Sequence, residues 1–243
     1  MTKVVIVTGG SRGIGAATSR LLASKGYRVC VNYRARASEA NAVVSDICAA
    51  GGKAIACAAD VSKEAEVMAL FDTAERSLGP VTHLVNNVGI LMAQSRLVDM
   101  DLDRFQTVLN TNVLSCFLCS REAVRRMKDG GAIVNVSSAA ARIGSPNEYI
   151  DYAASKGAMD TMTRGLSLEV AALGIRVNTV RPGFIYTSIH AEGGEPDRVD
   201  RLAPQIPMQR GGTPEEVAHA IAWLLSDEAS YVTGAFIDVA GGR

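Results

Sequence analysis

The chain has 243 residues, with 25 basic and 25 acidic side chains, so its formal net charge is zero. This balance excludes the basic surplus that draws proteins to nucleic acids or anionic membranes, and 48% apolar residues exclude a disordered chain. The length fits one large α/β domain or two small ones.

Short apolar runs alternate with helical patterns along the chain. Val4–Val7 is too short for a helix and is followed by a glycine pair, so it predicts a first strand. Further strands are expected at 28–33, 54–58, 83–86, 132–136, 176–180 and 236–239. Helices are expected at 14–25, 38–50, 63–77, 102–127, 150–172 and 214–226. Strands that are apolar throughout and alternate with helices predict one α/β domain over 1–243, with a doubly wound, seven-stranded parallel sheet between two helical layers.

One segment breaks this alternation. Residues 186–212 are polar and contain Gly193-Gly194 and three prolines. Long loops in compact domains are usually lids or binding loops, so we expect a substrate loop at about 184–212.

The cysteines and the apolar runs indicate where the protein works. No run reaches the roughly 18 apolar residues that cross a bilayer, so we expect no membrane association. Five cysteines are an odd number and lie mostly in apolar surroundings, which favours reduced thiols in the cytoplasm. Cys116 and Cys119 form a C-x-x-C pattern without a second pair or a nearby histidine, so no metal site is expected.

A glycine-rich turn follows the first strand and opens the first helix. Gly9, Gly13 and Gly15 leave room for the backbone to approach a pyrophosphate, and the helix N-terminus offers free N–H groups to that anion. A plain tight turn is the alternative, which the strand before and the helix after disfavour. The turn therefore predicts a dinucleotide site.

The end of the second strand indicates which dinucleotide binds. An acidic residue there would favour NAD, but the sequence runs Asn32-Tyr33-Arg34. Arg34 can form a fork with a 2′-phosphate, and Arg12 in the glycine turn can add a second charge. We therefore expect NADP(H) to be preferred, with NAD(H) possible; the alternative is that Arg34 is merely solvated.

Three ordered motifs together carry a family resemblance. The glycine turn, Asn86-Asn87-Val88-Gly89 and Tyr152-Ala153-Ala154-Ser155-Lys156 closely resemble the short-chain dehydrogenase/reductase family over essentially the whole chain. Val88 departs from the alanine that is more common there. The resemblance implies a seven-stranded Rossmann fold, NAD(P) as cofactor and the interconversion of alcohols and carbonyls. It also implies a homodimer or a homotetramer, of which we expect the homotetramer.

The resemblance also implies roles for individual residues. Ser138, Tyr152 and Lys156 match the catalytic triad, and Asn112 matches the asparagine that completes a tetrad. Ser138 is chosen over Ser137 from its spacing to Tyr152. The implied cofactor-binding positions are Gly9, Ser11, Arg12, Gly13, Ile14, Gly15, Tyr33, Arg34, Asp60, Val61, Asn87, Gly89, Tyr152, Lys156, Pro182, Gly183, Ile185 and Thr187, with Val136 under the cofactor.

These residue types suit hydride transfer to a carbonyl, which leaves an oxygen in need of a proton. Tyr152 can give that proton, and Lys156, one helical turn later, is expected to lower the tyrosine pKa from its usual value of roughly 10. Ser138 can hydrogen-bond the substrate oxygen, and Asn112 can hold a water that links Lys156 to solvent. His190, in the long loop, is a candidate substrate contact.

Several functions remain open. The first is an NADP-dependent carbonyl reductase or alcohol dehydrogenase acting on a small molecule. A 3-oxoacyl-[acyl-carrier-protein] reductase is an alternative. Similar enzymes hold the acidic carrier with arginines, but the matching positions here, Asp129 and Leu173, are not basic. The nearby basic residues Arg125, Arg126 and Lys128 could take their place. A glucose-type sugar dehydrogenase is another. A non-catalytic nucleotide sensor is disfavoured because both Tyr152 and Lys156 are present.

Overall fold

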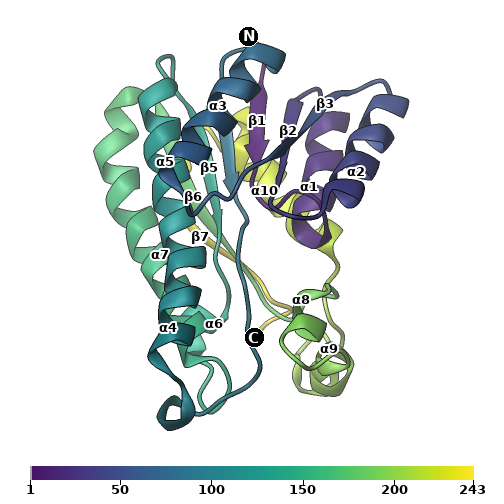
Figure 1. Ribbon diagram of the computed structural model, residues 1–243, viewed down its shortest axis with the longest axis vertical. Coiled ribbons are helices and arrows are strands. Elements are labelled where there is room, and N and C mark those ends of the chain that lie inside the picture. Colours follow the sequence, from purple (N-terminus) through teal and green to yellow (C-terminus); the bar gives the residue numbers. More distant parts are fainter. Residues whose placement is uncertain (1) are drawn as a thin grey trace.

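A single parallel sheet forms the centre of the molecule (Figure 1). The computed structural model describes residues 2–243. Seven strands lie in the order β3-β2-β1-β4-β5-β6-β7, and every neighbouring pair is parallel. The strands are β1 (Val4–Val7), β2 (Arg28–Tyr33), β3 (Lys53–Ala58), β4 (His83–Asn86), β5 (Gly131–Val136), β6 (Ile175–Pro182) and β7 (Phe236–Val239). The predicted doubly wound, seven-stranded Rossmann fold is confirmed.

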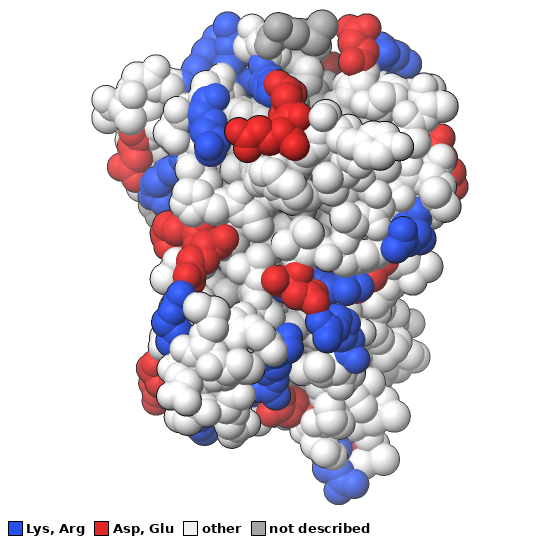
Figure 2. Space-filling model, turned by 180° about the vertical axis from the view of Figure 1, so that it is seen from behind, with Lys and Arg blue, Asp and Glu red and all other residues white. Residues whose placement is uncertain are grey.

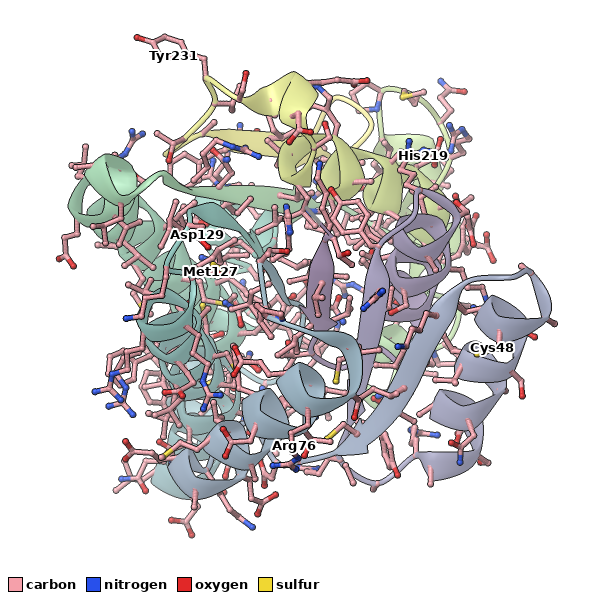
Figure 3. All side chains as sticks on the ribbon, turned by 90° about the horizontal axis from the view of Figure 1, so that it is seen from above. Cys48, Arg76, Met127, Asp129, His219 and Tyr231 are labelled. Carbon is pink, nitrogen blue, oxygen red and sulfur yellow. The ribbon has the colours of Figure 1, made fainter. Side chains whose placement is uncertain are left out.

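Helices cover both faces of this sheet. One layer contains α1 (Gly13–Ser24), α2 (Ala37–Ala49) and α10 (Pro214–Leu225), and the other contains α3 (Glu64–Leu78), α5 (Ser115–Arg126) and α7 (Ile150–Val170). Figure 3, which looks down on the sheet from above, shows His219 of α10 and Arg76 of α3 on opposite sides of it. The central strands are therefore buried on both faces, whereas the edge strands β3 and β7 are partly exposed.

The first strand shows how the sequence builds two cores at once. Val4 and Ile6 point into one core, and Val5 and Val7 into the other; all four are fully buried. Successive side chains of a strand point to opposite faces, so only a strand that is apolar throughout can fill both layers. This explains why the strands lack the alternation of apolar and polar residues.

The order of the strands determines where a ligand can bind. β1 lies between β2 and β4, so the chain leaves the two central strands β1 and β4 in opposite directions. A crevice opens at such a point, outside the carboxyl ends of the strands. In Figure 1 the helices α8 (Ile189–Glu192) and α9 (Arg198–Leu202) lie beyond these ends, on the opposite side of the molecule from α4 (Leu102–Leu109).

Two segments differ from the sequence prediction. The predicted loop 186–212 contains the short helices α8 and α9 and a 3₁₀ turn, because prolines and glycines interrupt helices without preventing single turns. The predicted helix 102–127 is divided into α4 and α5 by a π-helical turn, Asn110–Leu114. The structure also contains a short helix, α6 (Ala140–Ile143), which the sequence analysis missed.

The surface carries charges of both signs. Figure 2 shows basic and acidic side chains interspersed over the back of the molecule, with no broad field of one sign on that face. Within residues 2–243, no helix has the length and apolar character required to cross a bilayer.

Candidate active site

A cleft of about 670 Å³ runs along the carboxyl ends of the strands. Its lining includes residues from the glycine turn at one end and from α7 at the other. All the predicted catalytic and cofactor-binding residues line this cleft except Gly15 and Asn112. The structure thus brings together residues that are far apart in the sequence, such as Arg12 and Thr187.

The glycine turn has the close backbone packing that the sequence predicted. Gly9 and Gly13 have φ angles of +60° and +50°, which favour glycine. A Cβ atom at Gly15 would lie 2.3 Å from the carbonyl oxygen of Gly9, so no side chain fits there. Asn87 Nδ2 fixes the turn by donating to the carbonyls of Thr8 and Gly9, each at 3.1 Å. The turn and the first turn of α1 therefore form a cradle with the shape that a pyrophosphate requires.

A buried asparagine connects this turn to the neighbouring strands. Asn32 Oδ1 accepts from the N–H of Gly9 at 3.3 Å, and Asn32 Nδ2 donates to the carbonyl of Ala59 at 3.1 Å. It fixes β3 next to the expected adenine site. The sequence analysis missed this role, and the only available signal was a polar residue inside an otherwise apolar strand.

Asp60 lines the cleft at the end where the adenine is expected. Partial burial raises the pKa of its carboxyl, but hydrogen bonds from Ser62 and the charge of Arg34 outweigh that effect and lower the pKa below its usual value. Asp60 is therefore an ionised hydrogen-bond acceptor at neutral pH.

Tyr152 and Lys156 lie one turn apart on α7, as predicted. Lys156 Nζ is 5.7 Å from the centre of the Tyr152 ring and donates to the carbonyl of Val136 at 2.8 Å. The hydroxyl of Ser138 contacts the phenol, whereas Ser137 is buried and donates to the carbonyl of Lys156. The phenol, the ammonium and the Ser138 hydroxyl thus meet at one end of the cleft.

Burial controls the proton affinities of this pair. Burial lowers the pKa of Lys156 to about 8, although the charges of nearby groups oppose the shift. Burial raises the pKa of Tyr152, and the hydrogen bond with Ser138 opposes that rise. The sequence analysis expected Lys156 to lower the tyrosine pKa. The structure differs because transfer of both groups out of water disfavours the phenolate and the ammonium alike.

Asn112 lies in the π-helical turn, behind the wall of the cleft. Its Oδ1 accepts from the N–H of Ile90 at 2.8 Å, and its Nδ2 donates to the Ile90 carbonyl and to Ser155 Oγ at 3.2 and 2.9 Å. Both amide hydrogens are engaged, so the side chain holds the β4–α4 loop against α7. Asn112 Oδ1 accepts one hydrogen bond and could accept a second from a water. The expected role of Asn112 in holding that water stays a prediction.

A buried ion pair fixes the start of α7. Arg104 Nε donates to Asp151 Oδ2 at 2.7 Å, and Arg104 Nη1 donates to the carbonyl of Ala93 at 2.7 Å. Asp151 is 1% exposed and directly precedes Tyr152. The pair therefore ties the catalytic helix to the loop that borders the cleft.

Residues 186–212, which we call the lid, contribute several side chains to the lining of the cleft. At its base the N–H of Tyr186 donates to the carbonyl of Gly212 and the N–H of Gly212 donates to the carbonyl of Phe184, and Thr187 lies 3.3 Å from where a Cβ of Gly13 would be. Within the lid, Arg198 is buried, pairs with Glu148 and Glu195, and lies over the ring of Tyr149. The charges at the substrate end are thus largely paired within the protein.

His190 is a buried part of the lid and lines the cleft. Its Nε2 lies 3.2 Å from the carbonyl of Ile185, which requires Nε2 to carry the hydrogen. Burial lowers the pKa of this imidazole, so it is neutral at pH 7. The predicted substrate contact by His190 stays a prediction.

The chain was compared with known proteins. A family model described as enoyl-(acyl carrier protein) reductase matches residues 9–243. The uncharacterized oxidoreductase YgfF of Escherichia coli is 60% identical, over 99% of each chain. Glucose 1-dehydrogenase 2 of Bacillus subtilis is 40% identical, over 99% of this chain and 94% of the relative.

The fold and the motifs agree with these matches. The solved structure of a mutant short-chain dehydrogenase/reductase from Serratia marcescens superposes with a TM-score of 0.92 at 37% identity, covering 99% of this chain and 97% of that one. The chain belongs to the short-chain dehydrogenase/reductase family of NAD(P)-dependent oxidoreductases.

Proposed function

We propose that this enzyme interconverts an alcohol and a ketone or aldehyde, with NADP(H) preferred over NAD(H) and Tyr152 as the general acid and base. The observation that carries the proposal is the cleft, which has the phenol and ammonium of Tyr152 and Lys156 at one end and the glycine cradle at the other. The nicotinamide nucleotide supplies or accepts the hydride.

The protein's own residues supply the proton and the polarisation. In the reductive direction Tyr152 gives its hydroxyl proton to the carbonyl oxygen as negative charge develops there. Ser138, which contacts the phenol, donates a hydrogen bond to the same oxygen. The Lys156 ammonium, 5.7 Å from the centre of the Tyr152 ring, offsets part of the cost that burial imposes on the remaining phenolate. Asn112 keeps α7 in place beside the β4–α4 loop.

The nucleotide site follows the cleft from end to end. We propose that Gly9, Ser11, Gly13, Ile14 and Gly15 hold the pyrophosphate. The adenosine would contact Tyr33, Arg34, Asp60, Val61, Asn87 and Gly89. The nicotinamide end would contact Lys156, Pro182, Gly183, Ile185 and Thr187.

The preference for NADP(H) is supported by three arginines at the rim of the cleft, Arg12, Arg34 and Arg36. Within residues 2–243, no carboxylate forms an ion pair with Arg34, so its guanidinium is available to a 2′-phosphate. We expect Arg34→Asp to lower the ratio of kcat/KM for NADP to that for NAD by more than about tenfold. Steady-state kinetics with both cofactors measure this ratio, and an unchanged ratio refutes the assignment of Arg34.

Tyr152→Phe tests the chemistry. This variant removes only the phenolic oxygen, so we expect turnover to fall by about a hundredfold to ten-thousandfold while the Kd for NADPH changes less than about threefold. Phe236→Leu, on β7, is a control that changes an aromatic ring elsewhere. Retention of turnover by Tyr152→Phe would show that another group supplies the proton, whereas a wild type that binds NADPH without turning over any substrate would indicate a nucleotide sensor.

A sugar dehydrogenase is the second candidate, because a glucose 1-dehydrogenase is 40% identical over nearly the whole chain.

The positions expected to hold an acyl carrier protein lie far from the cleft of the same chain, which disfavours the 3-oxoacyl reductase alternative. Asp129 precedes β5 and Leu173 precedes β6, so both lie at the amino ends of the strands, opposite the cleft (Figure 3 labels Asp129). Of the three possible substitutes, Arg125, Arg126 and Lys128, Arg126 is already paired with Glu122, Asp72 and Glu75. A panel of ketones, sugars and 3-oxoacyl thioesters with both cofactors separates the three.

We also propose that the protein is a cytoplasmic homotetramer. Apolar side chains that are exposed on α5 and α7, Phe117 at 42% and Leu168 at 75%, support burial against another copy. The five free cysteines support a reducing compartment. Light scattering of the purified protein measures the assembly.

A further inference from the structure

The last residue of α8 reaches across the cleft to the arginines of the cofactor site. Arg12 forms a two-point ion pair with Glu192, in which Arg12 Nη2 donates to Glu192 Oε2 at 2.7 Å. Arg36 Nη2 donates to Glu192 Oε1 at 3.0 Å. Arg12 also donates to Ser188 Oγ at 2.9 Å, so the lid is attached to the glycine turn at two points.

These arginines belong to the rim that would meet a 2′-phosphate. Arg12, Arg34 and Arg36 all line the same cleft, at the end of β2 where the adenosine ribose is expected. Two of the three already bind the carboxylate of Glu192, and only Arg34 has no such partner within residues 2–243. The hydrogen bond from Arg12 lowers the pKa of Glu192, so the carboxylate is charged at neutral pH. A phosphate at this rim must therefore share the arginines with a fixed negative charge.

The rest of the lid remains attached when this contact is lost. Its base is held by the backbone hydrogen bonds of Gly212 with Tyr186 and Phe184, and Gly193 packs against Leu91, whose side chain lies 3.0 Å from where a Cβ of Gly193 would be. Arg198 holds the centre through Glu148 and Glu195. Displacement of Arg12 from both Glu192 and Ser188 would release only the tip, residues 188–192, within which His190 stays hydrogen-bonded to the carbonyl of Ile185.

We propose that Glu192 is a specificity-determining residue of the lid: its carboxylate competes with the 2′-phosphate of NADP(H) for Arg12 and Arg36. NADP(H) then displaces the tip of the lid from the glycine turn, whereas NAD(H), which carries no 2′-phosphate, leaves the tip attached. Glu192 thereby reduces the preference for NADP(H) over NAD(H) that Arg34 creates. The inference rests on the nucleotide site proposed above.

Glu192→Gln tests this competition because it keeps the size of the side chain and removes its charge. We expect the Kd for NADPH to fall about fivefold, which is about 1 kcal/mol at 1.4 kcal/mol per factor of ten. The Kd for NADH should not fall, since NADH has no phosphate at this rim. Titrations followed by nicotinamide fluorescence measure both constants in the full chain.

Glu64→Gln is the matched control. Glu64 is also an exposed carboxylate paired with an arginine, Arg121, but the pair joins α3 to α5 away from the cleft. We expect the ratio of the two Kd values to stay unchanged in this variant. An equal effect of both substitutions would indicate a general effect of net charge and would overturn the proposal.

Limited proteolysis gives a second, independent measurement. In the wild type, thermolysin, which cleaves on the amino side of apolar residues such as Ile189, should cut within 188–192 faster with NADPH bound than with NADH bound, and Glu192→Gln should remove this difference. The competition is refuted if Glu192→Gln leaves the ratio of the Kd for NADPH to the Kd for NADH unchanged, or if it weakens binding of both nucleotides by the same factor. Either result leaves the proposed function standing. A wild-type protein that binds neither nucleotide refutes the proposed function and this inference with it.

Discussion

The buried lysine of the active site should make the stability of the fold depend on pH in the alkaline range. Lys156 is 2% exposed, and burial lowers its pKa from 10.5 to about 8. Lys156→Met removes the titrating group and keeps a side chain of similar length and shape. The difference in unfolding free energy between wild type and variant therefore isolates the cost of the buried charge.

The size and sign of this effect follow from the shift in pKa. A shift of about 2.5 units corresponds to about 3 kcal/mol at 1.36 kcal/mol per unit. Below pH 8 both the folded and unfolded states are protonated, and the folded state bears this whole cost. Above about pH 8 the folded state loses its proton first, so the cost falls as the pH rises and vanishes above about 10.5. About 2.5 kcal/mol should be recovered between pH 7 and pH 10.

Urea unfolding of both proteins, without added nucleotide, measures this difference at each pH. Other groups titrate in the same range, but they are common to both proteins and cancel in the difference. Between pH 7 and pH 10 the unfolding free energy of the wild type should rise by about 2.5 kcal/mol relative to that of Lys156→Met. A difference that stays constant over this range would refute the conclusion that burial controls the proton affinity of Lys156.

Two further predictions concern residues outside the catalytic pair. Burial, with the charge of Lys3, lowers the pKa of His83 to about 4, so the unfolded state binds a proton first as the pH falls below about 6.5. The wild type should lose up to about 3 kcal/mol between pH 6.5 and pH 4 relative to His83→Gln, and parallel acid-unfolding curves would contradict this. Gly15→Ala should weaken NADPH binding more than about tenfold, because the new Cβ would lie 2.3 Å from the Gly9 carbonyl. The control is Gly165→Ala on α7, where the new methyl group would have no atom within 4 Å and binding should not change.

The strands were predicted well because their signal is local. The bounds of β1, β2, β4 and β7 agree with those expected from the sequence, and in β1, β2 and β4 burial on both faces keeps the strand centres apolar. The helices were located less precisely. The apolar periodicity of 102–127 continues across the π-helical turn, so it gave no sign that one extra residue is accommodated at Asn110–Leu114. The short helices α6, α8 and α9 are held by tertiary contacts that no local pattern records.

The site shows the same division between local and tertiary information. The glycine turn and the Tyr152–Lys156 spacing were visible because each is a short motif with its own geometry. Nothing in the sequence indicated that Glu192 pairs with Arg12, 180 residues away. The pKa of Tyr152 was also beyond reach, because it depends on burial by several distant segments.

The π-helical turn between α4 and α5 makes the position of Asn112 sensitive to chain length. Deletion of one residue there would join α4 and α5 into one regular α-helix, and each residue of an α-helix turns the chain by about 100°. The asparagine would rotate out of reach of Ile90 and Ser155, although no side chain had been exchanged. A single lost codon could therefore disconnect the catalytic helix from the β4–α4 loop, so this enzyme's activity depends on the spacing of these residues as much as on their identity.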